Sequence, residues 1–334
     1  MFLGLKKKFS LLLLIISLAV IVFFTWERNS LVTFRGEIMG TTYKVVLINY
    51  DGSDAEGNIF NVLNSVNEEM STYLKSSSIS ELNRSNIDEW VYVSDNFLKV
   101  AVFSQETCLA TEGSFNISIG YFVNYYGFGP PELADSYDGS KLMELRDQIS
   151  CSSYKVDSEN KRIKRLNDVY LDMSAVAKGF AIDLLSTYLD SYAIDSYFIE
   201  LGGEIKYKGH KSSDQPWLVA IENPDLASPP ILTLSSKEYE NLSLATSGEY
   251  RNFSRREGNL VSHTIDPITF KPINKKHVSV SVIAENVMKA DALATALNVM
   301  GLEKGLEYSN KNHIKSLYIV KEEGNLVLKT SKWF

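Results

Sequence analysis

Apolar residues recur at two different spacings along the chain, and these spacings predict both strands and helices. Tyr43, Val45 and Leu47 alternate with other residues after the turn-prone Met39-Gly-Thr41, as in a strand that buries one face. Residues 59–70 have helical spacing behind Asp54, which is placed to cap that helix. Further helices are expected over 95–111, 141–149 and 175–192, and the first of them should end at Gly113 in a left-handed conformation.

Strand patterns dominate the second half of the chain. Two or three strands are expected between residues 154 and 172, and a helix-rich stretch over 286–309. Further strands are predicted over 197–201, 204–208, 217–222, 231–234, 242–246, 278–284, 316–320 and 326–329. Because strands and helices are clustered rather than strictly alternating, the pattern favours an α+β fold over a parallel βαβ fold.

The N-terminal segment has the pattern of a membrane anchor. Lys6, Lys7 and Lys8 precede an uncharged, largely apolar run over 9–26, whose 18 residues are just enough to cross a bilayer as a helix. We expect residues 1–26 to form an uncleaved signal anchor and residues 27–334 to lie outside the cytoplasm. A cleaved signal peptide is the alternative, although Ser17-x-Ala19 is a weak cleavage site. The absence of a cysteine after the run argues against a lipoprotein anchor.

Composition narrows the classes of chemistry. The chain has 334 residues, 45% hydrophobic and 22% charged, with a net charge of −7, as in a folded protein of one large or two modest domains. The acidic balance without a basic block argues against nucleic acid as a partner. Two cysteines and four histidines exclude a zinc ribbon or an iron–sulfur cluster built from this chain alone, so its chemistry must rely on oxygen ligands. Cys108 and Cys151 could pair in an oxidising compartment or remain two buried thiols.

A pair of oxygen donors marks a candidate metal site. Asp291 and Thr295 lie four residues apart in a predicted helix and therefore share one face. A carboxylate and a hydroxyl suit Mg²⁺, which usually keeps waters and substrate phosphates in its other positions. Helix capping or simple solvation is the alternative explanation.

The segment from Asp172 to Gly179 joins a strand end to a helix start. Free backbone N–H groups at such a junction favour an anionic ligand, although Asp172 or Ser174 could merely cap the helix. Lys178 could face a phosphate or a ring, or be solvated.

Three other motifs are turn-rich. Glu200-Leu-Gly-Gly-Glu204 predicts a tight turn, and it would also let a flat ligand approach the backbone. His263, inside Ser262-His-Thr-Ile-Asp-Pro267, could accept a proton near neutral pH or be structural. The aromatic stretch 113–130 could line a pocket for a planar group or belong to the core.

The order of these motifs is more informative than any one of them. Together they resemble the ApbE-type FAD:protein FMN transferase family, from about Phe34 onward. The resemblance is carried by Met39-Gly-Thr-Thr-Tyr43, Ser71-Thr-Tyr73, Ser80-Glu-Leu-Asn83, Gly113 to Gly120, Tyr126-Gly-Phe-Gly-Pro130, Asp172 to Gly179, Leu201-Gly-Gly203, Thr246-Ser-Gly-Glu-Tyr250, Ser262 to Pro267 and Ala290 to Thr295. It implies an ApbE-like (T-fold-like) arrangement of mixed or antiparallel sheets with packed helices, in one domain over 27–334.

The family implies a function as well as a fold. Its members are extracytoplasmic, Mg²⁺-dependent enzymes that move FMN from FAD onto a Thr or Ser hydroxyl of a partner protein and release AMP. Partners are typically membrane redox subunits, such as those of Na⁺-pumping quinone reductases and related electron-transport complexes. We therefore expect a protein of the bacterial inner membrane, with its catalytic domain facing the periplasm or the cell exterior. Mg²⁺-dependent FAD hydrolysis to FMN and AMP, and flavin binding without turnover, are the alternatives.

The resemblance also assigns roles to residues. It implies that FAD is contacted by Met39, Tyr73, Ser114, Phe115, Asn116, Asp172, Lys178 and Ile265, and that the metal is held by Asp291, Thr295 and the backbone carbonyl of Ala175. His263 would accept the proton of the acceptor hydroxyl or orient that hydroxyl. Two positions depart from the family: many relatives have Asp where this chain has Asn116, and some carry an acidic residue where it has Ala294, so fewer charges face the ligands here.

Overall fold

The computed structural model describes residues 30–334 apart from 51, 53, 135–138, 213–214, 225–227, 249–252, 257–258 and 275–276. The expected membrane segment, residues 1–26, lies outside this part of the chain. Among the described residues no helix is both long and apolar enough to span a bilayer.

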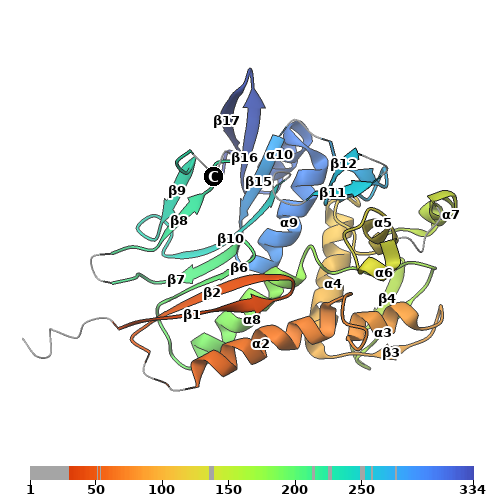
Figure 1. Cartoon of the computed structure of the whole chain (residues 1–334), viewed down its shortest axis with the longest axis horizontal. Coiled ribbons are helices and arrows are strands. Elements are labelled where there is room, and N and C mark those ends of the chain that lie inside the picture. The colour runs from red at the N-terminus through yellow and green to blue at the C-terminus, as the bar shows by residue number, and fades with distance from the viewer. Residues whose placement is uncertain are drawn as a thin grey trace, which may run out of the picture.

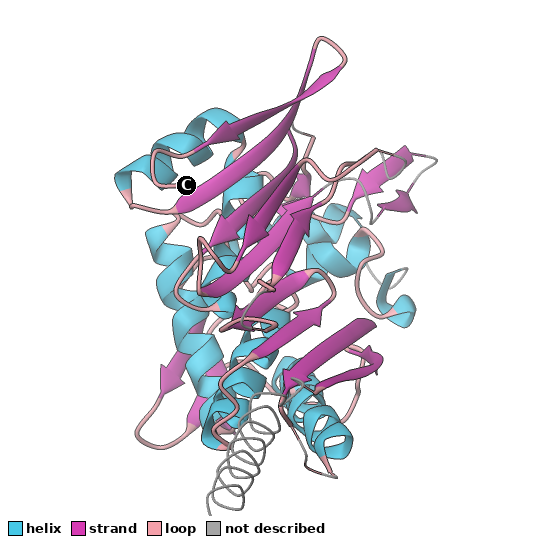
Figure 2. Ribbon diagram, turned by 90° about the vertical axis from the view of Figure 1, so that its left-hand side faces the viewer, coloured by secondary structure: helices cyan, strands magenta, loops and turns pink. Residues whose placement is uncertain are grey.

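A single large sheet organises the molecule (Figure 1). Its eight strands are antiparallel to their neighbours, and Figure 2 shows them as one twisted layer. In spatial order they are β1 (Leu31–Ile38), β2 (Thr41–Ile48), β6 (Tyr197–Leu201), β7 (Glu204–Lys208), β10 (Asn241–Gly248), β15 (His277–Ile283), β16 (Lys315–Glu322) and β17 (Asn325–Thr330). The predicted α+β class is confirmed.

Smaller sheets lie around this one. A three-stranded sheet has the order β3 (Val91–Tyr92), β5 (Arg162–Arg165) and β4 (Tyr154–Asp157). Three two-stranded units are formed by β8 (Leu218–Ile221) with β9 (Leu232–Ser235), β11 (Phe253–Arg256) with β12 (Asn259–Ser262), and β13 (Ile265–Asp266) with β14 (Lys271–Pro272). The predicted strands over 217–222 and 231–234 therefore exist but do not join the large sheet.

Both faces of the large sheet are buried. Val45 and Leu47 of β2 pack in the core that includes α2 (Ala55–Met70) and α8 (Ala177–Ser191). Val46 and Ile48 point to the opposite face, where the β8–β9 hairpin covers them. Burial on both faces explains why this strand is a nearly continuous apolar run rather than a clean alternation.

The expected helices are present, with small differences at their ends. They are α2, α4 (Asp95–Ala110), α8, α9 (Val287–Met300) and α10 (Leu302–Lys311), while the expected helix over 141–149 consists of α7 (Gly139–Leu145) and a 3-10 turn (Arg146–Gln148). Three short helices were not predicted: α3 (Ser78–Arg84), α5 (Gly120–Tyr125) and α6 (Pro131–Ala134). Asp54 does precede α2, but its side chain makes no capping hydrogen bond. Gly113 has the expected left-handed φ of 84°.

Two tight turns meet at one end of the sheet. Met39 and Gly40 both have positive φ and join β1 to β2, as two-residue hairpins require. Gly202 and Gly203, also with positive φ, join β6 to β7, which confirms the predicted turn. A Cβ on Gly202 would lie 2.9 Å from the Thr41 side chain, so glycine permits the two turns to touch.

Cys108 and Cys151 form a disulfide, which decides between the two states left open by the sequence. Cys108 lies near the end of α4, and Cys151 lies in the turn that leads to β4. The bond therefore joins two segments whose cysteines are 43 residues apart. One of these segments, the end of α4, directly precedes the stretch 113–120.

Candidate active site

A single cleft of about 1310 Å³ collects the residues selected from the sequence. It lies where the two turns, the start of α8, the middle of α9 and several irregular segments meet. Its lining includes all of them: Met39, Tyr73, Ser114, Phe115, Asn116, Asp172, Ala175, Lys178, His263, Ile265, Asp291 and Thr295. The structure thus brings together residues from six separate motifs, while their individual roles stay predictions.

Close packing of α8 against α9 forms one side of this cleft. A Cβ on Gly179 would lie 2.5 Å from the Val287 carbonyl oxygen, so only glycine allows the two helices to approach this closely. At this contact the Gly179 N–H donates to Asp291 Oδ2 at 3.1 Å. The Asp183 carboxylate accepts from the N–H groups of Val287 and Met288 at 3.1 and 2.8 Å, and so holds the first turn of α9. The position of Asp291 is therefore set by the close packing of two helices and by hydrogen bonds from backbone N–H groups to carboxylates across that contact.

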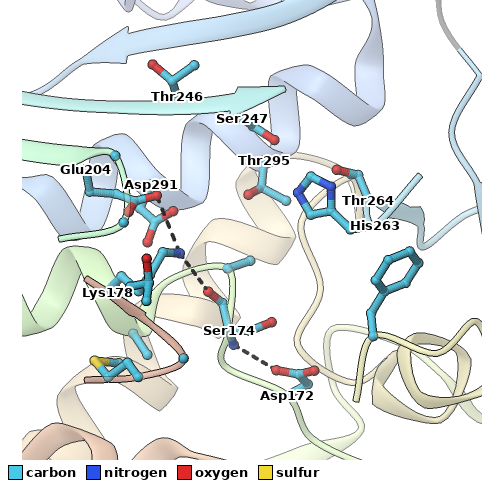
Figure 3. Close-up of a pocket in the computed structure, with 18 of the residues that line it drawn as sticks. Asp172, Ser174, Lys178, Glu204, Thr246, Ser247, His263, Thr264, Asp291 and Thr295 are labelled. Carbon is cyan, nitrogen blue, oxygen red and sulfur yellow. Dashed lines mark hydrogen bonds and ion pairs between the residues drawn. The ribbon is translucent and has the colours of Figure 1, made fainter. Parts of the chain in front are cut away.

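Lys178 lies among three carboxyl groups. Its Nζ is 3.4 Å from Glu204 Oε1, and Figure 3 shows it between Glu204 and Ser174 with Asp291 nearby. Burial acts to lower the pKa of Lys178, but the charges of Asp291, Glu204 and Asp172 outweigh it and raise this pKa, which keeps the ammonium charged. This region of the cleft therefore holds more carboxyl groups than ammonium groups.

Glu204 is a site residue that the sequence did not reveal. The glycine pair before it predicted a turn, and nothing in the pattern indicated that this turn leads into a cleft. Its side chain is only 6% exposed, and Oε2 has no hydrogen-bond partner among the described residues. Burial raises the pKa of Glu204 to about 8, although Lys178 opposes this shift. A buried carboxylate oxygen without a donor is suited to a bound cation or to a ligand N–H group.

The proposed metal ligands fit a hard cation. Asp291 and Thr295 face the cleft one turn apart on α9, and Ala175 lies on the lining two residues before α8 begins. Burial raises the pKa of Asp291, while Lys178 and the Gly179 N–H oppose the shift. No group of three or more His, Cys, Asp or Glu side chains able to hold a metal occurs in the described part of the chain. A site here would therefore combine one carboxylate with hydroxyl and carbonyl oxygens, which suits Mg²⁺.

Asp172 does not cap α8, contrary to the simpler explanation of its position. Its Oδ1 accepts from the Ser174 N–H at 2.8 Å, and its own N–H donates to the Ile117 carbonyl at 2.8 Å. A turn over 174–176 precedes α8, which begins at Ala177, two residues later than predicted. Burial raises the pKa of Asp172, opposed by the Ser174 N–H.

Irregular segments form the other side of the cleft. Phe115 is 1% exposed and belongs largely to the core, while Asn116 Oδ1 accepts from the Ser118 N–H at 2.9 Å. The amide of Asn116 thus supports a local turn that an aspartate could also make. Ile265 is buried in a cluster with Phe122 and Phe270, close to α5.

Aromatic side chains connect this side of the cleft to His263. The Tyr73 hydroxyl donates to the Phe128 carbonyl at 2.9 Å, and the Phe128 ring meets His263 edge-on at 6.2 Å between centroids. Figure 3 shows His263 and Thr264 beside Thr295 and Ser247, across the cleft from Asp172. The candidate proton acceptor and a candidate metal ligand therefore line the same cleft, although they come from different parts of the sequence.

Comparisons with known proteins agree with this geometry. The chain is 36% identical over 296 residues to the FAD:protein FMN transferase of Vibrio cholerae, covering 87% of this chain and 88% of that protein. It is 32% identical to the enzyme of the same name from Haemophilus influenzae, covering 92% of each. The solved structure of the flavin transferase ApbE from Vibrio cholerae superposes with a TM-score of 0.78 at 33% identity, over 92% of this chain and 98% of that one. The apo form of the flavinyl transferase ApbE from Pseudomonas stutzeri superposes with a TM-score of 0.80 at 28% sequence identity, over 92% of this chain and 96% of that one. The ApbE family profile matches residues 39–318, and the chain belongs to the ApbE family.

Proposed function

We propose that this protein is an FAD:protein FMN transferase. The observation that carries the proposal is the meeting, in one cleft, of the oxygen ligands Asp291 and Thr295 with His263 and Lys178. The names of the two relatives described above support the same activity. The reaction moves the FMN half of FAD onto a Thr or Ser hydroxyl of a partner protein.

The proposed chemistry is a phosphoryl-group substitution. The acceptor hydroxyl oxygen forms a bond to the phosphorus on the FMN side, the bond from that phosphorus to the bridging oxygen breaks, and AMP leaves. His263 takes the proton of the attacking hydroxyl, a role that suits a neutral imidazole. Lys178, kept charged by its carboxyl neighbours, offsets negative charge on the diphosphate.

We propose Mg²⁺ as the metal, held by Asp291, Thr295 and the carbonyl oxygen of Ala175. When bound, it would neutralise charge on the diphosphate and stabilise the developing charge of the leaving group. The excess of buried carboxyl groups around Lys178 supports a cation in this region. Because residue 294 is an alanine, Ala294, and not an acidic residue, Asp291 is the only carboxylate among the proposed metal ligands.

For FAD we propose contacts along the rest of the cleft. The set comprises Met39, Tyr73, Ser114, Phe115, Asn116, Asp172, Lys178 and Ile265, all of which line it. Tyr73 is 58% exposed at the edge of the cleft, where its ring is available to a flat ligand.

We also propose a location and a class of partner. Residues 1–26 would anchor the protein in the bacterial inner membrane, with residues 27–334 facing the periplasm or the cell exterior. The disulfide is compatible with such an oxidising compartment. Acceptors would be membrane redox proteins, such as subunits of Na⁺-pumping quinone reductases or related electron-transport complexes.

The test incubates the purified full-length chain with FAD, Mg²⁺ and a candidate acceptor domain. Flavin fluorescence that stays with the acceptor after denaturation is the expected result. Free FMN and AMP without labelled acceptor would instead indicate an FAD pyrophosphatase, and unchanged FAD would indicate a flavin-binding protein without turnover. An acceptor whose target Thr or Ser is replaced by Ala serves as the matched control.

A further inference from the structure

Asn298 is a buried polar residue to which neither the sequence nor the proposed reaction gives a role. It lies on α9, seven residues after Asp291 and three after Thr295, and is 0% exposed. The helical period places these three residues on the same face. The face of α9 that carries the proposed metal ligands thus continues into a buried amide.

The side chain of Asn298 joins α9 to two other segments. Its Nδ2 donates to Ser247 Oγ at 3.0 Å and to Thr264 Oγ1 at 3.2 Å. Ser247 belongs to β10, and Thr264 directly follows His263. Both donor hydrogens of the amide are therefore used to hold separate elements that line the cleft.

Thr264 is itself held firmly. It is 6% exposed, its N–H donates to Ser262 Oγ at 3.1 Å, and its carbonyl accepts from the Ile273 N–H at 2.9 Å. A displacement of Thr264 would therefore move the backbone that carries His263. Through one hydrogen bond, Asn298 ties this backbone to the helix that carries Thr295.

We infer that Asn298 is a positioning residue that fixes the distance between His263 and the oxygen ligands Asp291 and Thr295. The inference rests on the proposed function, because it assumes that the imidazole and the ligands act together. A proton acceptor and a reacting phosphate must be aligned to within a fraction of an ångström, and one hydrogen bond from a shared helix provides that alignment. Asn298 itself touches neither reacting group.

The test replaces Asn298 by Leu, which has a similar shape but no donor. We expect kcat for FMN transfer to fall about 10- to 100-fold, as small misplacements do, while KM for FAD changes less than about twofold. Thr264→Val removes the acceptor of the same hydrogen bond and should lower kcat similarly. The double variant should be no slower than the slower single variant, because both changes break one interaction.

Tyr318→Phe is the matched control for stability. The Tyr318 hydroxyl donates to the Leu297 carbonyl on the same helix, is buried, and does not line the cleft. Its loss should lower the melting temperature and leave kcat within about twofold of the original, since one buried hydrogen bond contributes about 1 kcal/mol to stability.

If N298L keeps its kcat, or if Y318F loses as much kcat for the same fall in melting temperature, the inference is wrong. His263→Gly, assayed in parallel, separates the two failures: full activity there contradicts the role of His263, whereas an inactive H263G beside a fully active N298L contradicts only Asn298.

Discussion

The two sides of the cleft are built in different ways. We call Ala175, Lys178, Glu204, Asp291 and Thr295 the helical wall, because they lie on or beside α8, α9 and β7. We call Tyr73, Ser114, Asn116, Phe128 and His263 the loop wall, because they lie outside the long helices and the large sheet. The first is fixed by close packing between regular elements and by carboxylates that accept from backbone N–H groups of those elements. The second is held by side-chain hydrogen bonds and ring contacts within irregular segments, near a disulfide.

The difference matches a division of chemical tasks. The helical wall holds charge: one ammonium and several buried carboxyl groups whose pKa values are raised by burial. The loop wall holds aromatic rings, amides and the imidazole, which suit a planar ligand and a proton transfer. We therefore expect changes in the helical wall to remove metal dependence, and changes in the loop wall to alter proton transfer, flavin binding or stability.

The largest effect is expected at Asp291. Asp291→Asn keeps an oxygen for the Gly179 N–H but removes the charge, so metal-dependent transfer should fall about 10,000-fold, the loss of several kcal/mol of charge stabilisation. Transfer rates measured over a range of Mg²⁺ concentrations check this. Asp183→Asn, which also affects a carboxylate bonded to α9 but lies outside the cleft lining, should retain the metal dependence. Full turnover by the Asp291 variant would contradict the assignment of Asp291 as a metal ligand.

His263 should show the next largest effect. His263→Gly removes the proposed proton acceptor, and kcat should fall about 1,000-fold, within the range of general-base catalysis. Binding of FAD, followed by its fluorescence, should change little, because His263 is not among the residues proposed to contact FAD. An unchanged transfer rate in this variant would mean that another group accepts the proton.

The disulfide should matter for the stability of the loop wall. The double variant Cys108→Ser, Cys151→Ser should have a free energy of unfolding about 4 kcal/mol lower, because the bond closes a loop of 43 residues. Urea denaturation of the variant and of the original protein, each with and without a reductant, measures the difference. Only the original protein should respond to the reductant; equal midpoints for all four samples would show that the bond contributes nothing.

The smallest effect is expected from titration of Glu204 without FAD or metal. Its folded pKa of about 8 exceeds the ordinary value of 4.5, so the folded state holds the proton more tightly. This contribution to the free energy of unfolding is complete below about pH 4.5 and is lost as the pH rises to about 8. Glu204→Gln should therefore reduce the fall in stability between pH 5 and 8 by about 1 kcal/mol or more. Identical pH dependence in both proteins would contradict the burial of this carboxyl group.

The same division explains what the sequence could predict. The spacing of Asp291 and Thr295 predicted a shared helical face, and the glycine pair at 202–203 predicted the hairpin with the correct strand limits on both sides. The fold class and nearly all long elements followed from local periodicity. These features depend on residues close together in the chain, where spacing carries the information.

The hydrophobic pattern along the sequence does not predict which distant segments pair with each other. The pairing of β2 with β6 and the contact of Phe128 with His263 join distant segments, and no local signal specifies them. Glu204 was missed because its environment is created by the contact of two hairpin turns with Lys178. Asn298 lies seven residues after Asp291, so helical spacing placed it on the metal face but could not show its bonds to Ser247 and Thr264.

If both walls act in one reaction, release of AMP and transfer of FMN to the acceptor must occur together, and the stoichiometry of the products measures this. The full-length chain, FAD, Mg²⁺ and an acceptor domain are incubated together, and AMP and the intact mass of the acceptor are measured over time. We expect one acceptor carrying one FMN for each AMP released, and no labelling when the target Thr or Ser is replaced by Ala. AMP released with free FMN, or FAD that remains intact, would contradict this expectation.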